Sequence, residues 1–324
     1  MAPNPVSFSV REATIADEPE LRALIAEMIP GVDVDARWRW MYEQNPGGRA
    51  LTWLAIAPTG EVAGCTSFFP FRLWLDGAEV RGALGGDGYV RPAFRRRGLG
   101  GLLHDASRRG MPAHAIGCMY GAPGAMNVTP LKHGGSRELG DVARWVRPLR
   151  AGPLPLAGLG RARLEPMAPN DPRVDDVWRE TRGVLRLAAV RDAAFYQWRF
   201  RDAPAQKQIA YVILDGEKAI GACALESLHD GKELHIVDLC AVRGAWHTCL
   251  RAIARHGALH TRARVASIKL FAIDARRRGM LRAGFVEREG KPFLCMIPAG
   301  GDRRFIDSQR WFYCGGDSDL DSLA

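Results

Sequence analysis

A basic, glycine-containing segment is the part of the sequence best suited to bind an anion. It runs from Tyr89-Val90-Arg91-Pro92 through Arg95-Arg96-Arg97 to Gly98-Leu99-Gly100-Gly101. An apolar strand candidate ends at Val90, and Pro92 prevents further strand pairing. Because the glycines lack bulk, backbone N–H groups at the start of the following helix can approach an anion at the positive end of the helix dipole. The segment has neither the Gly-Lys-Ser/Thr ending of a Walker loop nor the Gly-x-Gly-x-x-Gly fingerprint of dinucleotide-binding proteins.

The order strand, proline, arginine, glycines and helix resembles motif A of the GNAT superfamily of acyltransferases. The resemblance implies that the loop binds the pyrophosphate of acetyl-CoA or another acyl-CoA through Arg95, Arg96, Arg97, Gly98, Leu99, Gly100 and Gly101. It also implies that backbone groups of Gly88, Tyr89 and Val90 hold the pantetheine arm and polarise the thioester carbonyl. Asn127, followed by the turn at 131–135, resembles the family's fourth helix and is expected to contribute to cofactor binding.

Acyl transfer from a thioester to an amine needs an oxyanion site, a route for the amine proton and a proton for the leaving thiolate. Asp87 is the first candidate for the general base, because it lies three residues before Val90 among glycines that leave room for a substrate. Burial would raise the pKa of this carboxyl towards neutrality. The alternative is a solvated aspartate in a glycine-rich bulge. Glu43 and His133 are weaker candidates, since such residues on helices are usually polar surface groups.

A general acid is harder to assign. The family often places a tyrosine four residues before the glycine of the reversal turn, and here that position is Pro130. Tyr120, at the end of the next strand, is the candidate replacement; otherwise the thiolate leaves unprotonated. Two aromatic groups either belong to the core or shape the acceptor site: Trp38, Trp40 and Tyr42, and Phe68, Phe69, Phe71 and Trp74.

The segments around these residues alternate between strand and helix patterns. The expected strands are 6–11, 51–57, 62–75, 78–90 and 115–120, and the expected helices are 14–28, 35–43 and 99–111. Asp76-Gly77 between two strands is a hairpin signal. This order predicts an α/β (α+β) domain with a mixed sheet and helices packed against it.

An internal repeat predicts two such units. Trp38-Arg39-Trp40 is matched by Trp198-Arg199-Phe200 at an offset of 160 residues, and an apolar strand candidate follows each. Taken with the resemblance, the repeat predicts two GNAT-like domains in tandem. Residues 1–150 form the catalytic, acyl-CoA-binding domain, residues 151–172 a Pro/Gly-rich linker, and residues 173–324 the second domain.

The second unit lacks the phosphate loop. After the expected strand 233–242 the chain reads Arg243-Gly244-Ala245-Trp246-His247, with Trp246 where small residues would have to admit a pyrophosphate. We therefore expect a degenerate copy that keeps the helix 246–261 and the strand 267–273.

Composition narrows the class of protein. The chain has 324 residues, 47% hydrophobic and 25% charged, which excludes wholesale disorder. No apolar run approaches the ~20 residues that span a bilayer, and the start of the chain lacks signal-peptide features, so we expect a cytoplasmic protein without membrane contact. Seven cysteines without a C-x-x-C pair predict buried thiols and no metal site. The net charge of +9 favours anionic partners.

The interpretation best supported is a CoA-dependent N-acyltransferase, most simply an N-acetyltransferase, with one working unit. Its acceptor is the amine of a small molecule, for example an amino sugar or an amino-acid derivative. Protein or peptide acylation, and a non-catalytic acyl-CoA-binding module, stay open as alternatives. Nucleic-acid binding is not favoured, because the arginine clusters at 95–97, 276–278 and 303–304 lack helix-turn-helix or aromatic-sheet signatures. The acceptor, the acyl length and the oligomeric state are left open.

Overall fold

The computed structural model describes residues 8–152, 154–156, 160–271 and 274–318. In the first half the strands are β1 (Ser9–Glu12), β2 (Leu51–Ile56), β3 (Val62–Leu75), β4 (Ala78–Val90), β5 (Met119–Gly121) and β6 (Arg137–Pro148). The α-helices are α1 (Glu18–Met28), α2 (Val34–Arg37), α3 (Leu99–Gly110) and α4 (Ala125–His133). The predicted strand 6–11 begins two residues outside the described range, and β1 starts at Ser9.

The second half repeats this order. Its strands are β10 (Leu187–Ala189), β11 (Gln208–Asp215), β12 (Lys218–Leu228), β13 (Glu233–Ala241), β14 (Val265–Phe271), β15 (Val286–Met296) and β16 (Tyr313–Cys314). Its α-helices are α5 (Pro172–Arg182), α6 (Ala193–Tyr196), α7 (Trp246–His260) and α8 (Asp274–Arg282). Residues 272–273 of the predicted strand 267–273 lie outside the described residues.

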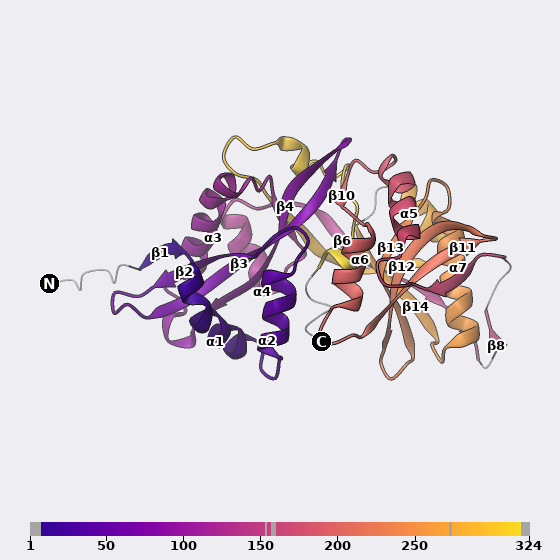
Figure 1. The fold of residues 1–324 in the computed structure, drawn as a ribbon, viewed down its shortest axis with the longest axis horizontal. Helices are drawn as coiled ribbons and strands as arrows, with labels where there is room; N and C mark the ends of the chain where they lie inside the picture. The colour runs from indigo at the N-terminus through magenta and orange to yellow at the C-terminus, as the bar shows by residue number, and fades with distance from the viewer. Residues whose placement is uncertain (1–7, 153, 157–159, 272–273, 319–324) are drawn as a thin grey trace.

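Both halves share one mixed sheet of 14 strands in the described part of the chain. Its order is β1-β2-β3-β4-β5-β15-β6-β14-β13-β12-β11-β9, so the two halves run inwards from opposite edges (Figure 1). At the centre, β15 of the second half pairs with β5, and β6 of the first half pairs with β14. Each half therefore supplies the strand that completes the other. The prediction of a mixed sheet built from two similar units is confirmed.

The segment between the halves contains short strands. β7 (Arg150–Ala151) and β8 (Leu154–Pro155) pair with each other, whereas β9 (Arg163–Pro166) pairs with β11 at the sheet edge. The domain boundaries at 150 and 172 stay a prediction, because strand exchange distributes each unit over both sides of them.

Local signals explain several elements. Asp76 and Gly77 have φ values of +46° and +105°, the left-handed pair that a tight β-hairpin turn requires, and they join β3 to β4 as expected. The expected helix 35–43 is a single α-helical turn, α2, followed by a π-helical segment, η2 (Trp38–Glu43); α6 continues in the same way into η5 (Gln197–Arg201).

Two tryptophans define the equivalence of the halves. The indole N–H of Trp40 donates to the carbonyl of Trp198 at 2.7 Å, and that of Trp198 donates to the carbonyl of Trp40 at 2.9 Å. This reciprocal pair matches Trp40 with Trp198, an offset of 158 residues. The offset of 160 inferred from the sequence is therefore wrong by two residues at this point.

The core is continuous across the halves. One buried cluster contains Leu24 and Tyr120 from the first half together with Val212 and Phe293 from the second. All seven cysteines are free and buried, as expected. Within the described residues, no helix is both long and apolar enough to cross a membrane.

Candidate functional site

The predicted phosphate loop lies between the end of β4 and the start of α3. Gly98 precedes the helix with a φ of +78°, and Arg96 also has a positive φ, of +62°. A Cβ atom added at Gly98, Gly100 or Gly101 would meet no atom within 4 Å. The glycines therefore leave open space in front of the first helical turn.

Backbone donors face this space. The N–H groups of Gly101 and Leu102 donate to the carbonyl of Gly98, at 3.1 and 3.2 Å. Among the described residues, the N–H groups of Gly98, Leu99 and Gly100 have no acceptor. Unsatisfied donors at a helix start, with the helix dipole behind them, are chemically suited to bind an anion.

The three arginines of the loop are exposed. Arg95 donates from Nε to the carbonyl of Val90 at 3.0 Å, and its guanidinium lies 5.8 Å from the ring centroid of Tyr89. Arg97 lies at the same distance from the ring of Phe94. These contacts fold the loop back on the end of β4 and keep its positive charge close to the open donors.

The strands behind the loop diverge. β4 and β5 run parallel and pair only at Ala83–Met119 and Leu84–Tyr120. Over residues 85–90, the edge of β4 that faces β5 has no strand partner in the described part of the chain. The backbone groups of Gly88, Tyr89 and Val90, the residues predicted to hold a pantetheine arm, lie along this stretch.

Asn127 lies in the first turn of α4, which packs against α3. Its side chain is exposed, and its backbone N–H donates to the carbonyl of Gly124 at 2.9 Å. The structure thus brings the helix of Asn127 beside the helix of the phosphate loop.

Asp87 is buried, with only 2% of its side chain exposed. Oδ1 accepts from Nη2 of Arg37 at 2.7 Å, and Oδ2 accepts from the hydroxyl of Tyr42 at 2.6 Å. Asp87 itself adopts a φ of +45°. Since both carboxylate oxygens are engaged and an arginine neutralises the charge, this geometry gives no support to Asp87 as a free general base.

Sequence analysis missed Arg37 and assigned Tyr42 no contact with Asp87. Burial, and next the charge of Asp87, raise the pKa of Tyr42 well above its ordinary value, so the hydroxyl keeps the proton that it donates. The second half has a cluster of the same composition from other positions. Asp238 accepts from Arg191, which precedes α6, at 3.1 Å and from the hydroxyl of Tyr196, which ends α6, at 2.7 Å. An arginine and a tyrosine five residues apart, present in both halves, were the available signal.

Tyr120 lies in the core rather than beside the loop. Its ring packs against Trp311 and Tyr313, with ring centroids 5.1 and 6.2 Å away. The hydroxyl is buried and has no partner in the described residues, and burial raises the pKa of Tyr120 well above its ordinary value. No contact in the described part of the chain joins it to Asp87. The geometry therefore gives the general-acid prediction no support.

The weaker base candidates lie at the surface. Glu43 forms an ion pair with Arg49 at 3.3 Å, and His133 is exposed at the end of α4. Neither contacts the loop in the described structure.

A pocket of about 200 Å³ opens beside Tyr42. Its wall includes Trp38, Tyr42 and Thr52, together with the charged residues Glu12, Glu18 and Arg49. Glu18 already forms an ion pair with Arg22 at 2.8 Å. The indole N–H of Trp38 is buried and finds no acceptor among the described residues. The ring of Trp38 stacks on Tyr42, with centroids 4.5 Å apart. An aromatic wall with charged groups of both signs at its edge is chemically suited to a small polar organic molecule.

In the second half, Trp246 begins α7 at the position equivalent to the loop glycines. Its indole packs so closely on Gly279 that a Cβ there would lie 2.8 Å from the ring, and its ring contacts Phe312 edge to face. Trp246 is thus part of the packing of this half. The described residues contain no group of three or more His, Cys, Asp or Glu that could hold a metal ion.

The sequence and the fold were compared with those of known proteins. No protein-family model matches the chain, and no curated protein matches it significantly. Solved structures do match. A GCN5-related N-acetyltransferase from Anabaena variabilis is 17% identical with a TM-score of 0.69, over 90% of this chain and 73% of that one. The fold is that of the GNAT acyltransferases.

Two further GNAT-fold structures agree. A protein from Enterococcus faecalis described as a probable N-acyltransferase is 13% identical with a TM-score of 0.69, over 90% of this chain and 73% of that one. The N-myristoyltransferase of Saccharomyces cerevisiae, solved with myristoyl-CoA, is 14% identical with a TM-score of 0.56, over 91% of this chain and 85% of that one. At these identities the likeness establishes the GNAT fold.

Proposed function

We propose that the protein is a CoA-dependent N-acyltransferase that binds one acyl-CoA in its first unit. The observation that carries this proposal is the start of α3, where three backbone N–H groups without acceptors face space kept free by Gly98 and Gly100. Exposed Arg95–Arg97 add positive charge at the same place. A pyrophosphate is the anion that this combination suits.

The diverging strands supply the second part of the site. Backbone groups of Gly88–Val90 that lack a strand partner towards β5 can bind the amides of a pantetheine arm and donate to the thioester carbonyl. Acyl-CoA supplies the activated acyl group. The protein would hold the thioester in place and stabilise the negative charge that develops on its carbonyl oxygen. We infer that Asp87 acts as a positioning residue, which ties α2 and η2 to β4 through Arg37 and Tyr42.

A small-molecule amine is the acceptor that we favour over a protein. The pocket beside Tyr42, at about 200 Å³, suits a small organic molecule better than a peptide chain. A cytoplasmic location is part of the proposal. Protein or peptide acylation is the second candidate within the same chemistry.

The test combines binding and turnover. Calorimetric titration with acetyl-CoA should give one site per chain, and a thiol reagent should detect CoA release when amino sugars or amino-acid derivatives are added. Release only with peptide amines would favour protein acylation. Binding without release for any amine would indicate a non-catalytic module. Failure to bind acetyl-CoA and longer acyl-CoAs would overturn the proposal.

A further inference from the structure

The two halves differ where their central parallel strands diverge. β13 and β14 pair from Glu233–Val265 to Ile236–Ile268 and then separate. Leu270 of β14 is flanked on one side by Ala143 of β6 and on the other by Cys314 of β16. β16 therefore lies on the side of β14 that faces β13, in the gap between the two strands.

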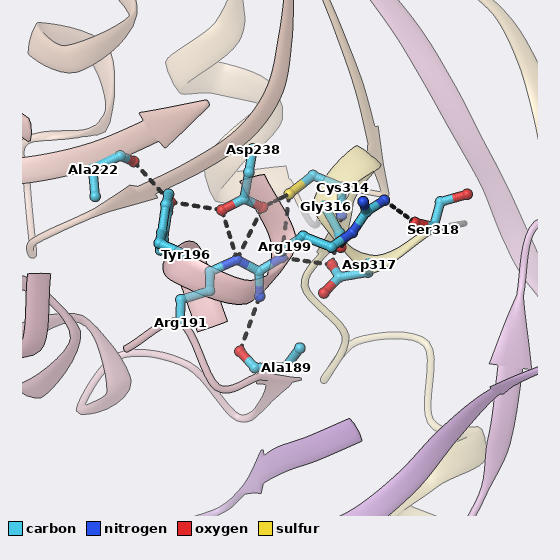
Figure 2. A network of polar contacts seen from close by, with 10 residues as sticks. All are labelled: Ala189, Arg191, Tyr196, Arg199, Ala222, Asp238, Cys314, Gly316, Asp317 and Ser318. Carbon is cyan, nitrogen blue, oxygen red and sulfur yellow. Dashed lines mark hydrogen bonds and ion pairs between the residues drawn. The ribbon is translucent and has the colours of Figure 1, made fainter. Parts of the chain in front are cut away.

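The segment Tyr313–Ser318, here called the C-terminal plug, is fastened in this gap by a buried network (Figure 2). The thiol of Cys314 donates to Oδ1 of Asp238 at 2.7 Å. Arg191 bridges Asp238, at 3.1 Å, and Asp317, at 2.6 Å. Burial and the charge of Asp238 raise the pKa of the Cys314 thiol well above its ordinary value, so the thiol stays protonated.

Main-chain groups of the plug are held as well. Arg199 donates to the carbonyl of Gly316 at 3.1 Å and also to that of Ser318. A Cβ atom at position 316 would lie 2.6 Å from Oδ1 of Asp238, so only glycine fits this close approach. All six residues of the plug are buried.

The equivalent gap in the first half holds no such segment from the described part of the chain. Asp87 and Asp238 occupy matching places on β4 and β13, each bound by an arginine and a tyrosine five residues apart. Beyond Leu84, the side of β4 that faces β5 pairs with no strand of the described chain. In the described part of the chain, a segment therefore lies between the central strands of the second unit, and none lies between those of the first unit.

We propose that the C-terminal plug is an internal occupant of the second unit's pantetheine slot, held there in place of a ligand. The inference rests on the proposed function of the first unit, because it takes the gap between β4 and β5 as the place of the pantetheine arm. It adds a second cause for a single acyl-CoA site: besides the lost phosphate loop, the slot itself is filled by the chain.

Cys314 reports on the plug without any measurement of acyl-CoA. We expect all seven cysteines of the folded wild-type chain to resist iodoacetamide, because all are buried. Gly316→Ala and Gly316→Val place carbon against Asp238 and should raise the alkylation rate of Cys314 at least about tenfold, the order of effect expected from overpacking. The other six cysteines should stay protected, as mass spectrometry of the peptides would show. Gly183→Val, at an exposed helix end with a φ of −65°, is the matched control.

Competition tests whether the vacated gap is a slot. S-Methylpantetheine, which has no free thiol to consume iodoacetamide, should raise the alkylation rate of Cys314 in Gly316→Ala further with concentration, because a ligand that binds the open state shifts the equilibrium towards it. No response to S-methylpantetheine, or alkylation of all cysteines together, would overturn the proposal. If Gly316→Val fails to fold, amide hydrogen exchange of the wild type tests whether the C-terminal plug is docked. The amides of residues 313–318 should be as protected as those of β14. Rapid exchange of these amides would overturn the proposal. Failure of the proposed function of the first unit would be detected separately, because the wild type would then show no binding in a titration with acetyl-CoA.

Discussion

At the scale of single residues, the two buried aspartates have the same partners and different surroundings. Asp87 lies near the open end of β4, whereas Asp238 lies against the C-terminal plug. Each neutralises a buried arginine, and removal of one partner from a buried ion pair leaves an uncompensated charge that costs about 3–5 kcal/mol. The pair therefore allows a structural role to be separated from a catalytic one.

Asp87→Asn and Asp238→Asn should each lower the free energy of unfolding by about 3–5 kcal/mol, measured by denaturant titration. If Asp87 only positions η2, Asp87→Asn should alter the acceptor KM while the pH profile of kcat keeps its shape. A loss in kcat of a hundredfold or more that is partly recovered at high pH would instead restore the general base. Asp238→Asn is the control, because it should lower the free energy of unfolding to a similar degree without changing the acceptor KM.

Asp317 predicts a pH dependence of stability. Burial raises its pKa to about 6, and the neighbouring charge of Asp238 acts in the same direction, against the effect of Arg191. Oδ1 of Asp317 has no partner in the described residues. The folded state holds the proton of Asp317 more tightly than the unfolded state does. The stabilisation of the folded state by this proton is therefore fully present below pH ~4 and is lost as the pH rises to about 6.

The wild type should therefore lose up to about 1.4 kcal/mol per pH unit from this group between pH 4 and 6. Asp317→Asn should show a flatter curve in that range, since the amide does not titrate. Urea unfolding at a series of pH values measures both. Asp176→Asn, at an exposed ion pair with Arg179, should keep the wild-type slope. Parallel curves for wild type and Asp317→Asn would contradict the assignment.

At the scale of elements, the starts of α3 and α7 form a natural comparison. Gly98 and Gly244 both have positive φ, +78° and +80°, and a Cβ at either would meet no atom within 4 Å. A side chain at either position is thus strained to a similar degree, about 1–2 kcal/mol. Both helix starts have backbone N–H groups without an acceptor in the described structure, but only the start of α3 combines them with the arginines of the phosphate loop.

Gly98→Val should weaken acetyl-CoA binding at least about a hundredfold, because it obstructs two or more charge-assisted hydrogen bonds to the pyrophosphate. Gly244→Val should leave binding unchanged. Thermal unfolding should show similar small losses of stability for both, and calorimetry should separate their binding. Equal binding by the two variants would remove the loop from the site.

At the scale of the whole molecule, the exchange of β6 and β15 makes the halves interdependent. β5 pairs with β15, and β6 lies between β15 and β14. A fragment cut at residue 150 would leave β5 without its outer neighbour and β6 without either one. Unpaired strands of this kind associate with other chains.

Residues 1–150 alone should therefore be less soluble than the full chain and should elute as aggregates in gel filtration. Binding of acetyl-CoA should be weaker, because β5 borders the proposed slot. Co-expression with residues 151–324 should recover a soluble complex, since the missing strands are then supplied. A monomeric fragment with full activity would show that the second half is dispensable.

Local signals in the sequence were enough to predict the glycine turn before α3, the β3–β4 hairpin and the two-unit plan. Each depends on neighbours along the chain: Pro92 ends a strand, Gly98 permits a left-handed φ, and Asp76-Gly77 forms a turn. The fold class followed from the order of such elements, and the absence of the loop from the second half was visible for the same reason.

Tertiary structure alone decided what surrounds the candidate side chains. Asp87 is not solvated, because Arg37 at the end of α2, 50 residues away, and Tyr42 of η2 bind its two carboxylate oxygens. Tyr120 is enclosed by Trp311 and Tyr313, which arrive from the end of the chain. The exchange of β6 and β15 and the C-terminal plug likewise join residues far apart in sequence. Hydrophobic periodicity predicts that a strand exists and which face it buries, but its neighbours are selected only when all strands compete for the same sheet.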